Sequence, residues 1–279
     1  MTRAAVYAGA DGAARVARAQ RDELVDAGPA PPGGFVPTEA AWAALEAADG
    51  RRLDATDVRL LTPVRPSKLV CVGLNYRDHA AEAGQPLPAR PLLFAKLPSA
   101  VIGPDEPVLV FDEADEMDYE AELALVVSRR IGPRDPVEPL AAIGGYTALN
   151  DVSARAVQMS EGQWTRGKSF DASAPLGPAI VRADPGFAWG ELPVQCRVSG
   201  ELLQDGHTRD LVFSPGELVA FIAARITLEP GDVIATGTPA GVGMAREPQR
   251  FLRAGDTLET IVGAAGVLRN PVHAARSGG

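Results

Sequence analysis

Residues 117–127 read Met-Asp-Tyr-Glu-Ala-Glu-Leu-Ala-Leu-Val-Val, an apolar run typical of a buried β-strand that nevertheless carries two glutamates. Side chains alternate across a strand with a period of two, so Glu120 and Glu122 are expected on the same face. Neighbouring carboxylates repel each other unless a positive charge lies between them. Hard oxygen ligands suit Mg²⁺, Mn²⁺ or Ca²⁺ better than zinc. The pattern therefore indicates either a metal site or the end of a solvated acidic run that begins at Asp112.

The composition of the chain limits the classes of protein to which it can belong. Of its 279 residues, 46% are hydrophobic and 23% are charged, which is ordinary for a globular protein. The formal net charge of −9 argues against nucleic acid or a membrane surface as a partner. Neither a secretory signal pattern nor an uninterrupted apolar run of about 18 residues occurs. Cys71 and Cys196 lie in strand-like runs and are expected to be buried free thiols, so we expect a soluble cytoplasmic protein.

The pattern of short strands predicts a β-rich α+β fold. From Ser67 onward, β-branched or apolar runs recur between glycines and prolines with few helical stretches, which indicates a sandwich or barrel. Ser214 and Glu217 form a capping-box pattern, which predicts a helix over 214–222. Residues 1–65 are predicted to form a small N-terminal subdomain, followed by the main domain at 66–279. The predicted strands are 69–72, 108–111, 123–127, 194–198, 233–236 and 257–262.

His79 and Glu82 are spaced like a general base and the group that orients it. On a short helix, residues three apart share a face, so the carboxylate of Glu82 would hold the imidazole and raise its basicity. The chain has only 3 histidines, and His79 is the one that lies among many other polar groups. The alternative is an incidental ion pair on a surface helix.

Four further polar side chains are candidates for the same site. Asp151 follows a predicted strand and would lie at or near a helix N-cap, where a carboxylate is also favoured for structural reasons. Gln158 lies about two helical turns further on and would share its face. Lys168 is predicted in a loop, where a lysine is usually a solvated cation. Thr238 belongs to the glycine-rich turn 237–243, which lacks the lysine of a phosphate-binding loop, and its hydroxyl could contact a ligand carboxylate.

Five motifs carry a resemblance to a known family. They are Gly-Leu-Asn-Tyr-Arg-Asp-His at 73–79, Asp-Tyr-Glu-Ala-Glu-Leu-Ala at 118–124, Asn-Asp-Val-Ser-Ala-Arg at 150–155, Gly-Lys-Ser-Phe-Asp at 167–171 and Gly-Thr-Pro-Ala-Gly-Val-Gly at 237–243. In this order they resemble the fumarylacetoacetate hydrolase family, over residues 66–272. The resemblance implies a mixed β-sandwich roll, a homodimer, one Mg²⁺ or Mn²⁺ ion and a small-molecule 2-oxo acid as substrate.

The resemblance also implies roles for individual residues. The implied metal ligands are Glu120, Glu122 and Asp151, with Asp78 as the nearest candidate for a further acidic ligand. The implied catalytic residues are His79, Glu82 and Lys168. The implied substrate-binding residues are Asn75, Gln158 and Thr238.

The reaction that we expect from this resemblance is hydrolysis of a C–C bond in an acylpyruvate-like or other β-diketo acid. The metal would stabilise an enolate, and His79, held by Glu82, would deprotonate water. The same enolate would also serve a decarboxylase or an isomerase of 2-oxo acids such as oxaloacetate or a 2-oxo-hexene-dioate. A non-catalytic metal- or ligand-binding protein is the alternative of another class. Segments 83–100 and 200–213 are expected to wall the pocket, where Arg90, His207 and Arg209 would meet a second carboxylate or face water.

Overall fold

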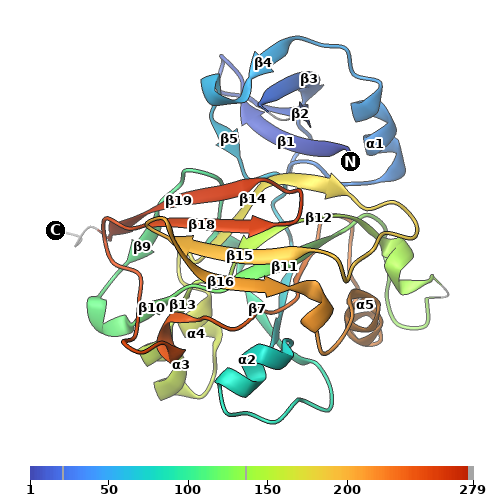
Figure 1. The fold of residues 1–279 in the computed structure, drawn as a ribbon. Coiled ribbons are helices and arrows are strands. Elements are labelled where there is room, and N and C mark those ends of the chain that lie inside the picture. The colour runs from blue at the N-terminus through green and yellow to red at the C-terminus, as the bar shows by residue number, and fades with distance from the viewer. Residues whose placement is uncertain (21, 136, 276–279) are drawn as a thin grey trace.

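Two β-sheets packed face to face form the body of the protein (Figure 1). The computed structural model describes residues 1–20, 22–135 and 137–275. The larger sheet has 12 strands, 10 of them in the order β4-β3-β2-β1-β14-β12-β11-β17-β6-β7, with β5 beside β1 and β8 beside β14. The smaller sheet has 5 strands in the order β16-β15-β18-β19-β9. This architecture, rich in strands with parallel and antiparallel pairs, confirms the predicted β-rich α+β fold of sandwich-roll type.

The elements have the following bounds. The strands are β1 (Arg3–Ala8), β2 (Ala14–Gln20), β3 (Glu23–Pro29), β4 (Arg52–Asp54), β5 (Leu60–Leu61), β6 (Leu69–Gly73), β7 (Leu92–Lys96), β8 (Val101–Ile102), β9 (Val108–Val110), β10 (Met117–Asp118), β11 (Ala121–Val127), β12 (Ile143–Asn150), β13 (Ser153–Ala154), β14 (Ala174–Arg182), β15 (Pro193–Val198), β16 (Glu201–His207), β17 (Val233–Ala235), β18 (Thr257–Val262) and β19 (Val267–Ala274). The α-helices are α1 (Glu39–Glu46), α2 (Arg77–Glu82), α3 (Arg155–Glu161), α4 (Thr165–Lys168) and α5 (Pro215–Ala223). Within the described ranges, none of the helices has the length and apolar character needed to cross a membrane.

The local sequence signals from Ser67 onward are confirmed. Each predicted strand is present, as β6, β9, β11, β15, β17 and β18. Helix α5 begins with the predicted capping box, in which Ser214 and Glu217 each accept a hydrogen bond from the other's backbone N–H. Cys71 and Cys196 are both buried and free.

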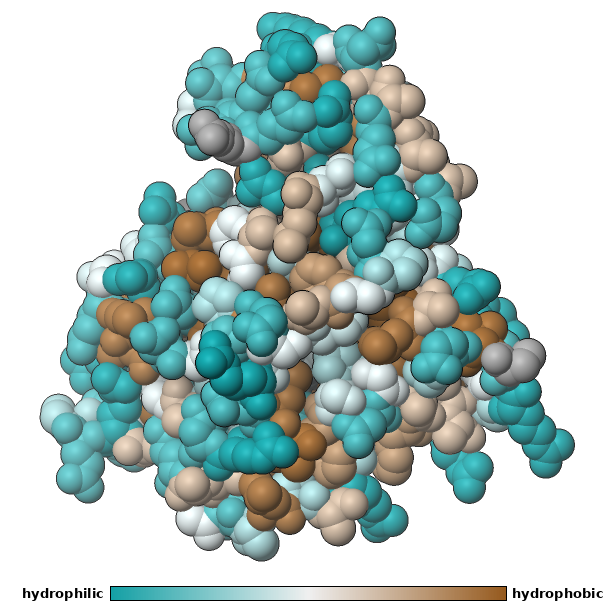
Figure 2. Space-filling view, turned by 45° about the vertical axis from the view of Figure 1, so that its right-hand side comes forward, coloured by the Kyte–Doolittle hydropathy of each residue, from teal (hydrophilic) through white to brown (hydrophobic). Residues whose placement is uncertain are grey.

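Residues 1–65 extend the large sheet. Strand β1 pairs with β14, and Trp42 of α1 is fully buried, with its indole N–H donating to the carbonyl of Gly144 at 2.9 Å. These residues form the lobe at the top of Figures 1 and 2, where hydrophilic side chains cover most of the visible face. The sequence predicted no strands here because the alanine-rich segments lack a clear alternation of apolar and polar residues. The domain boundary at residue 65 stays a prediction.

Strand β11 separates the core between the sheets from the face that carries the glutamates. Leu123 and Leu125 belong to the core shared with the smaller sheet, whereas Ala124 and Val126 pack on the opposite side. By the same alternation, Glu122 points away from the smaller sheet. The large sheet therefore presents its carboxylates on the face that the second sheet leaves uncovered.

A buried asparagine connects this face to the smaller sheet. The Asn150 side-chain oxygen accepts from the backbone N–H of Glu120 at 3.0 Å, and its amide donates to the Thr260 hydroxyl at 2.9 Å. Asn150 is fully buried, so loss of its side chain would leave buried polar groups unpaired. The contact between the two sheets thus fixes the position of the backbone at Glu120.

Candidate active site

Three buried carboxylates converge at the ends of β11 and β12. Register places Ala121 opposite Asn150, and the backbone N–H of Asp151 donates to the carbonyl of Glu120 at 2.8 Å. One oxygen atom from each of Glu120, Glu122 and Asp151 lies within 4.8 Å of those of the other two. Pairing of the two strands therefore brings together residues that are separated by about thirty positions in the chain.

Lys168 bridges two of these carboxylates. Its ammonium group donates to Glu120 Oε2 at 2.7 Å, to Asp151 Oδ2 at 2.8 Å and to the hydroxyl of Ser153 at 2.8 Å. Burial alone would lower the pKa of Lys168, but the negative charges of Asp151 and Glu120 raise it above its usual value. Lys168 is therefore held as a cation.

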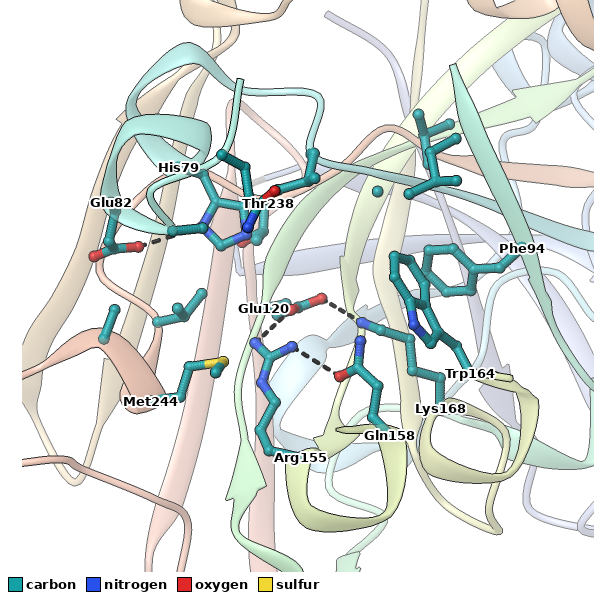
Figure 3. A pocket seen from close by; sticks show the side chains of 18 of the residues that line it. His79, Glu82, Phe94, Glu120, Arg155, Gln158, Trp164, Lys168, Thr238 and Met244 are labelled. Atoms are coloured by element: carbon teal, nitrogen blue, oxygen red, sulfur yellow. Dashed lines mark hydrogen bonds and ion pairs between the residues drawn. The ribbon is translucent and has the colours of Figure 1, made fainter. Parts of the chain in front are cut away.

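The predicted loop around Lys168 is instead the short helix α4, so that prediction was wrong. Gly167 explains the difference, because a Cβ atom at this position would lie 2.7 Å from the backbone nitrogen of Gln158. The glycine lets α4 pack closely against α3. This contact places Lys168 and Gln158 side by side in the same cavity (Figure 3).

A second buried lysine, Lys96 at the end of β7, was not identified from the sequence. Its ammonium group donates to Asp151 Oδ1 at 2.7 Å, to the carbonyl of Val152 at 3.1 Å and to the carbonyl of Lys168. A lysine ammonium has three donors, and all three are used. The only sequence signal is a lysine that ends the apolar run 92–96, which on its own is too common to mark a site.

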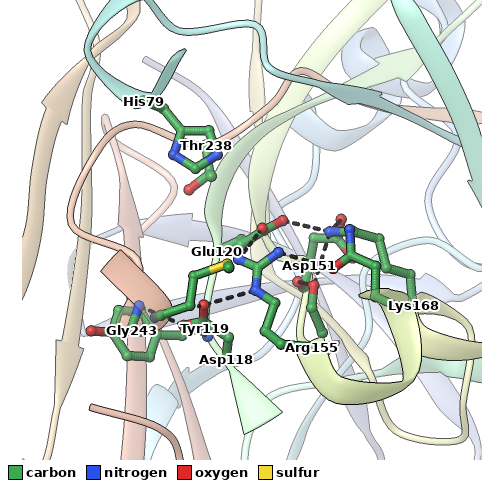
Figure 4. A network of polar contacts seen from close by, with 12 residues as sticks. His79, Asp118, Tyr119, Glu120, Asp151, Arg155, Lys168, Thr238 and Gly243 are labelled. Carbon is green, nitrogen blue, oxygen red and sulfur yellow. Dashed lines mark hydrogen bonds and ion pairs between the residues drawn. The ribbon is translucent and has the colours of Figure 1, made fainter. Parts of the chain in front are cut away.

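Arg155 and Asp118 complete the network and were also missed as a pair (Figure 4). Arg155 Nε donates to Asp118 Oδ2 at 2.9 Å, and its Nη2 donates to Glu120 Oε1 at 2.5 Å. Its Nη1 donates to Gln158 Oε1 at 3.0 Å, which leaves the amide NH₂ of Gln158 as the group that can donate to a ligand. Asp118 Oδ1 also accepts from the backbone N–H of Gly243 at 2.6 Å, so Asp118 ties Arg155 to the glycine-rich loop.

The expectation that Asp151 lies at a helix N-cap was wrong. Strand β12 ends at Asn150, β13 follows at Ser153–Ala154 and pairs with β10, and α3 begins only at Arg155 with Ala154 as its N-cap residue. The carboxylate of Asp151 is held by two lysines instead. Tertiary pairing, which is not visible in local sequence, replaces the capping interaction.

His79 and Glu82 form the expected pair on α2. His79 Nδ1 lies 3.3 Å from Glu82 Oε2, and Glu82 Oε1 accepts from the backbone N–H of Gly241 at 2.8 Å. Burial opposes ionisation of Glu82, but the hydrogen bonds from His79 and Gly241 hold its pKa below the usual value. With Nδ1 directed to a carboxylate, His79 has Nε2 available to accept a proton.

These groups surround a cavity of about 500 Å³ (Figure 3). His79, Glu82 and Thr238 lie on one side, Lys168 with Phe94 and Trp164 lies on the other, and Glu120 lies between them. The predicted site residues that line the cavity are His79, Glu82, Glu120, Glu122, Gln158, Lys168 and Thr238. The aromatic side chains of Phe94 and Trp164 were not predicted.

Asn75 and Thr238 have their polar groups engaged within the protein. Asn75 is fully buried and does not line the cavity, and its amide donates to the carbonyls of Thr236 and Phe213. The Thr238 hydroxyl donates to the carbonyl of Ala121 at 2.9 Å. Both residues hold the loops around the site, and their assignment to substrate binding stays a prediction.

The charged residues suggested for a second carboxylate lie outside the cavity. Arg90, His207 and Arg209 are absent from its lining. The expected wall at 200–213 is largely strand β16, whose partner is β15, whereas 83–100 does contribute Leu92 and Phe94. Asp78 accepts from the backbone N–H of Ala240 at 3.3 Å and is not part of the carboxylate group.

The donor set fits a divalent cation. The charges of Arg155 and Lys168 offset burial and hold the pKa of Glu120 below its usual range. Burial, together with the charges of Asp151 and Glu120, raises the pKa of Glu122 well above its usual value, and Gly237 donates its backbone N–H to the Glu122 carboxylate. The three carboxylates therefore offer hard oxygen ligands where positive charge is in deficit, as Mg²⁺ or Mn²⁺ requires.

The oriented histidine, the buried lysine and the carboxylate group form a site suited to acid–base chemistry beside carboxylates that could hold a divalent cation. The chain belongs to the fumarylacetoacetate hydrolase family, because residues 68–273 match the family described as fumarylacetoacetate (FAA) hydrolase C-terminal.

Several known proteins are similar over most of the chain. Oxaloacetate tautomerase FAHD2B, mitochondrial, of Bos taurus is 42% identical over 223 residues, covering 79% of this chain and 71% of that protein. An uncharacterized protein of Archaeoglobus fulgidus is 46% identical over 224 residues, covering 80% and 85%. The crystal structure of a 2-hydroxyhepta-2,4-diene-1,7-dioate isomerase from Mycobacterium marinum superposes with a TM-score of 0.78 at 34% identity, covering 99% of this chain and 100% of that one. The fumarylacetoacetate hydrolase from Exiguobacterium antarcticum gives 0.81 at 33% identity with the same coverage.

Replacing Glu122 by Gln is expected to stabilise the metal-free protein. A raised pKa means that the folded state holds the Glu122 proton more tightly, so stability is greatest below the unfolded value of about 4.3 and falls as pH rises toward the folded pKa. At pH 7 the Gln variant should therefore melt at a higher temperature than the parent, by about 2–4 °C for each ~1 kcal/mol of stabilisation. Thermal unfolding in EDTA measures this change.

Glu120→Gln is the matched control for that experiment. Its carboxylate is paired with Arg155 and Lys168, so the neutral variant should melt at a lower temperature than the parent. Calorimetric titration should show that both variants lose Mg²⁺ affinity. If the two variants shift the melting temperature in the same direction, the claim that the Glu122 carboxylate lacks a compensating positive charge is refuted.

Replacing Lys96 by Met is expected to destabilise the protein by about 3–5 kcal/mol, because the Asp151 carboxylate and two carbonyls lose a buried partner. Lys68→Met is the matched control. Lys68 pairs with Asp232 at 2.6 Å but is partly exposed, and Asp232 keeps the Ser67 hydroxyl as a donor. Its loss should cost about 0–1 kcal/mol. Equal decreases in the free energy of unfolding of the two variants, measured by chemical denaturation, would show that Lys96 is not a fixed part of the network.

Proposed function

We propose that this protein is a metal-dependent enzyme that moves a proton at the carbon next to the carbonyl of a 2-oxo acid, as a tautomerase or isomerase does. The pair of His79 and Glu82, facing Lys168 across the carboxylate group, carries this proposal. In this arrangement the proposed base and the ammonium group of Lys168 lie on opposite sides of one cavity. The similarity to oxaloacetate tautomerases and to a dienedioate isomerase supports proton transfer over the hydrolysis expected first from the sequence.

The residues divide into those that bind the substrate and those that move the proton. Glu120, Glu122 and Asp151 would hold a divalent cation, which supplies Lewis acidity toward the 2-oxo group when bound. Lys168 and the amide NH₂ of Gln158 would donate hydrogen bonds to the oxygens of the bound acid. The cationic state of Lys168 favours the negative charge that develops on the carbonyl oxygen as the proton leaves.

His79 would carry the proton. Its Nε2 accepts the proton from C3, and the electrons of the broken C–H bond move toward the 2-oxo oxygen. Glu82 stabilises the imidazolium that results, because its carboxylate is held ionised by Gly241 and by His79 itself. Protonation of the oxygen gives the enol, return of the proton to C3 gives the keto form, and return to a more distant carbon of a dienolate gives an isomer.

Hydrolytic cleavage of an acylpyruvate is the second candidate, and the same histidine favours it. A water molecule beside His79 Nε2 would be deprotonated in place of C3 and would attack the distal carbonyl. The similarity to a solved fumarylacetoacetate hydrolase supports this alternative.

An assay on the enol form of oxaloacetate tests the proposal. With Mg²⁺ present, the protein is expected to accelerate the loss of the enol absorbance without release of CO₂ or pyruvate, and EDTA should abolish the effect. Acetylpyruvate serves as the parallel substrate. Cleavage of acetylpyruvate to pyruvate and acetate, with no effect on the enol of oxaloacetate, would replace the tautomerase by the hydrolase.

Substitution at the proposed base should separate catalysis from binding. His79→Ala is expected to lower kcat by about 10²- to 10⁴-fold, and Glu82→Gln by a smaller factor in the same direction, because general-base catalysis is lost or weakened. His273→Ala is the control, since His273 lies in β19 on the smaller sheet and is exposed. If His79→Ala keeps the parent kcat, another group carries the proton.

A further inference from the structure

The lysine and arginine side chains of the cavity lie close together. Among the described residues, its only lysine and arginine lining groups are Lys168 and Arg155. Both lie beside Glu120, with which they form ion pairs at 2.7 Å and 2.5 Å. These cations can meet the 2-oxo acid head of a substrate. The rest of the described lining has no lysine or arginine. A longer substrate with a second carboxylate at its other end would therefore find no such cation there.

The wall beyond the head is apolar and well packed. The rings of Phe94 and Trp164 are in edge-to-face contact, with centroids 5.5 Å apart, and Leu92 lies beside them. Gly73 makes this packing possible, because a Cβ atom there would lie 3.0 Å from the Trp164 ring. The wall begins next to the head-binding end, since Lys168 Nζ lies 5.0 Å from the centroid of Phe94 (Figure 3).

Two methionines add apolar surface elsewhere on the lining, and Figure 3 shows Met244 across the cavity from Phe94 and Trp164. Met159 is 70% exposed and Met244 is 36% exposed, and both line the same cavity. A volume of about 500 Å³ is in the range that holds a ligand much larger than a four-carbon acid. A small dicarboxylate would fill the charged end and leave the apolar wall unused.

We propose that the substrate is a 2-oxo acid with an extended apolar substituent, which packs along Leu92, Phe94 and Trp164, and that a distal carboxylate is disfavoured. This inference rests on the proposed function, because it assumes that the head of the acid binds at the carboxylate group. Burial of apolar surface supplies the preference, and each methylene removed from water should tighten binding about three- to fourfold.

Oxamates test the preference without turnover, because they share the 2-oxo acid head and do not react. Oxamate, N-pentyl oxamate and N-(4-carboxybutyl) oxamate have the same head, and the last two have tails of matched length. Titration calorimetry of the Mg²⁺-loaded protein is expected to give at least tenfold tighter binding for the pentyl compound than for oxamate. The carboxybutyl compound should bind more weakly than the pentyl compound.

Variants of the wall locate the effect. Trp164→Ala should remove most of the gain from the pentyl tail and leave oxamate affinity unchanged, whereas Trp164→Phe should keep most of it. Phe221→Ala is the remote control, because this side chain is 39% exposed on α5 and does not line the cavity. Met159→Arg places a cation at the mouth on an exposed position, so it should fold normally and improve binding of the carboxybutyl compound about tenfold.

The outcomes distinguish failure of the apolar preference from failure of the proposed function. Binding of oxamate with equal or tighter binding of the carboxybutyl compound by the parent protein would overturn the apolar preference and leave the proposed function standing. Failure of all three compounds to bind in the presence of Mg²⁺ would overturn both. Equal loss of oxamate and pentyl affinity in Trp164→Ala would also overturn the inference, because the indole would then act on the head of the ligand.

Discussion

The compensation of buried charge is the interaction on which both the fold and the site depend. Separate segments supply the charges, which would each be strongly unfavourable if buried alone. The large sheet helps to bring them together, since β7, β11 and the end of β12 belong to it, α4 packs against its edge strand β7, and α3 packs against α4. The carboxylates are Asp118, Glu120, Glu122 and Asp151, and the cations are Lys96, Arg155 and Lys168.

Within the part of the chain that the structure describes, Glu122 is the carboxylate of this network that has no cationic partner. Lys96 and Lys168 neutralise Asp151, and Arg155 joins Lys168 in neutralising Glu120, whereas Glu122 accepts a backbone N–H. A carboxylate without a cationic partner would lower the stability of the metal-free protein and would also attract a dication to the site. In the proposed function, protein stability and metal affinity would therefore be opposed at Glu122, as is common where a functional group is held in an unfavourable environment.

The sequence predicted what is local and missed what depends on distant partners. The β-branched runs, the capping box at Ser214 and the spacing of His79 and Glu82 encode their structure within a few residues, and the structure contains each of them. The role of Lys96 depends on partners at 151, 152 and 168, which no local pattern reveals. The prediction that Asp151 lies at a helix N-cap was wrong for the same reason. Asp151 forms an ion pair with Lys96, a distant residue, and the local sequence signal for a helix start does not reveal such a partner.

The division between hydrolysis and tautomerisation also lies outside the motifs. Both proposed reactions would use the same carboxylates, the same lysine and the same base, so residues that identify the family do not separate its activities. The two proposals differ in the group that His79 Nε2 would meet, a water molecule or a C–H bond, and the shape of the substrate would decide between them. Phe94 and Trp164, which belong to none of the polar motifs, form the wall against which the proposed substrate would lie. On this proposal, apolar side chains would set the selectivity, while the charged network would supply a reaction common to many substrates.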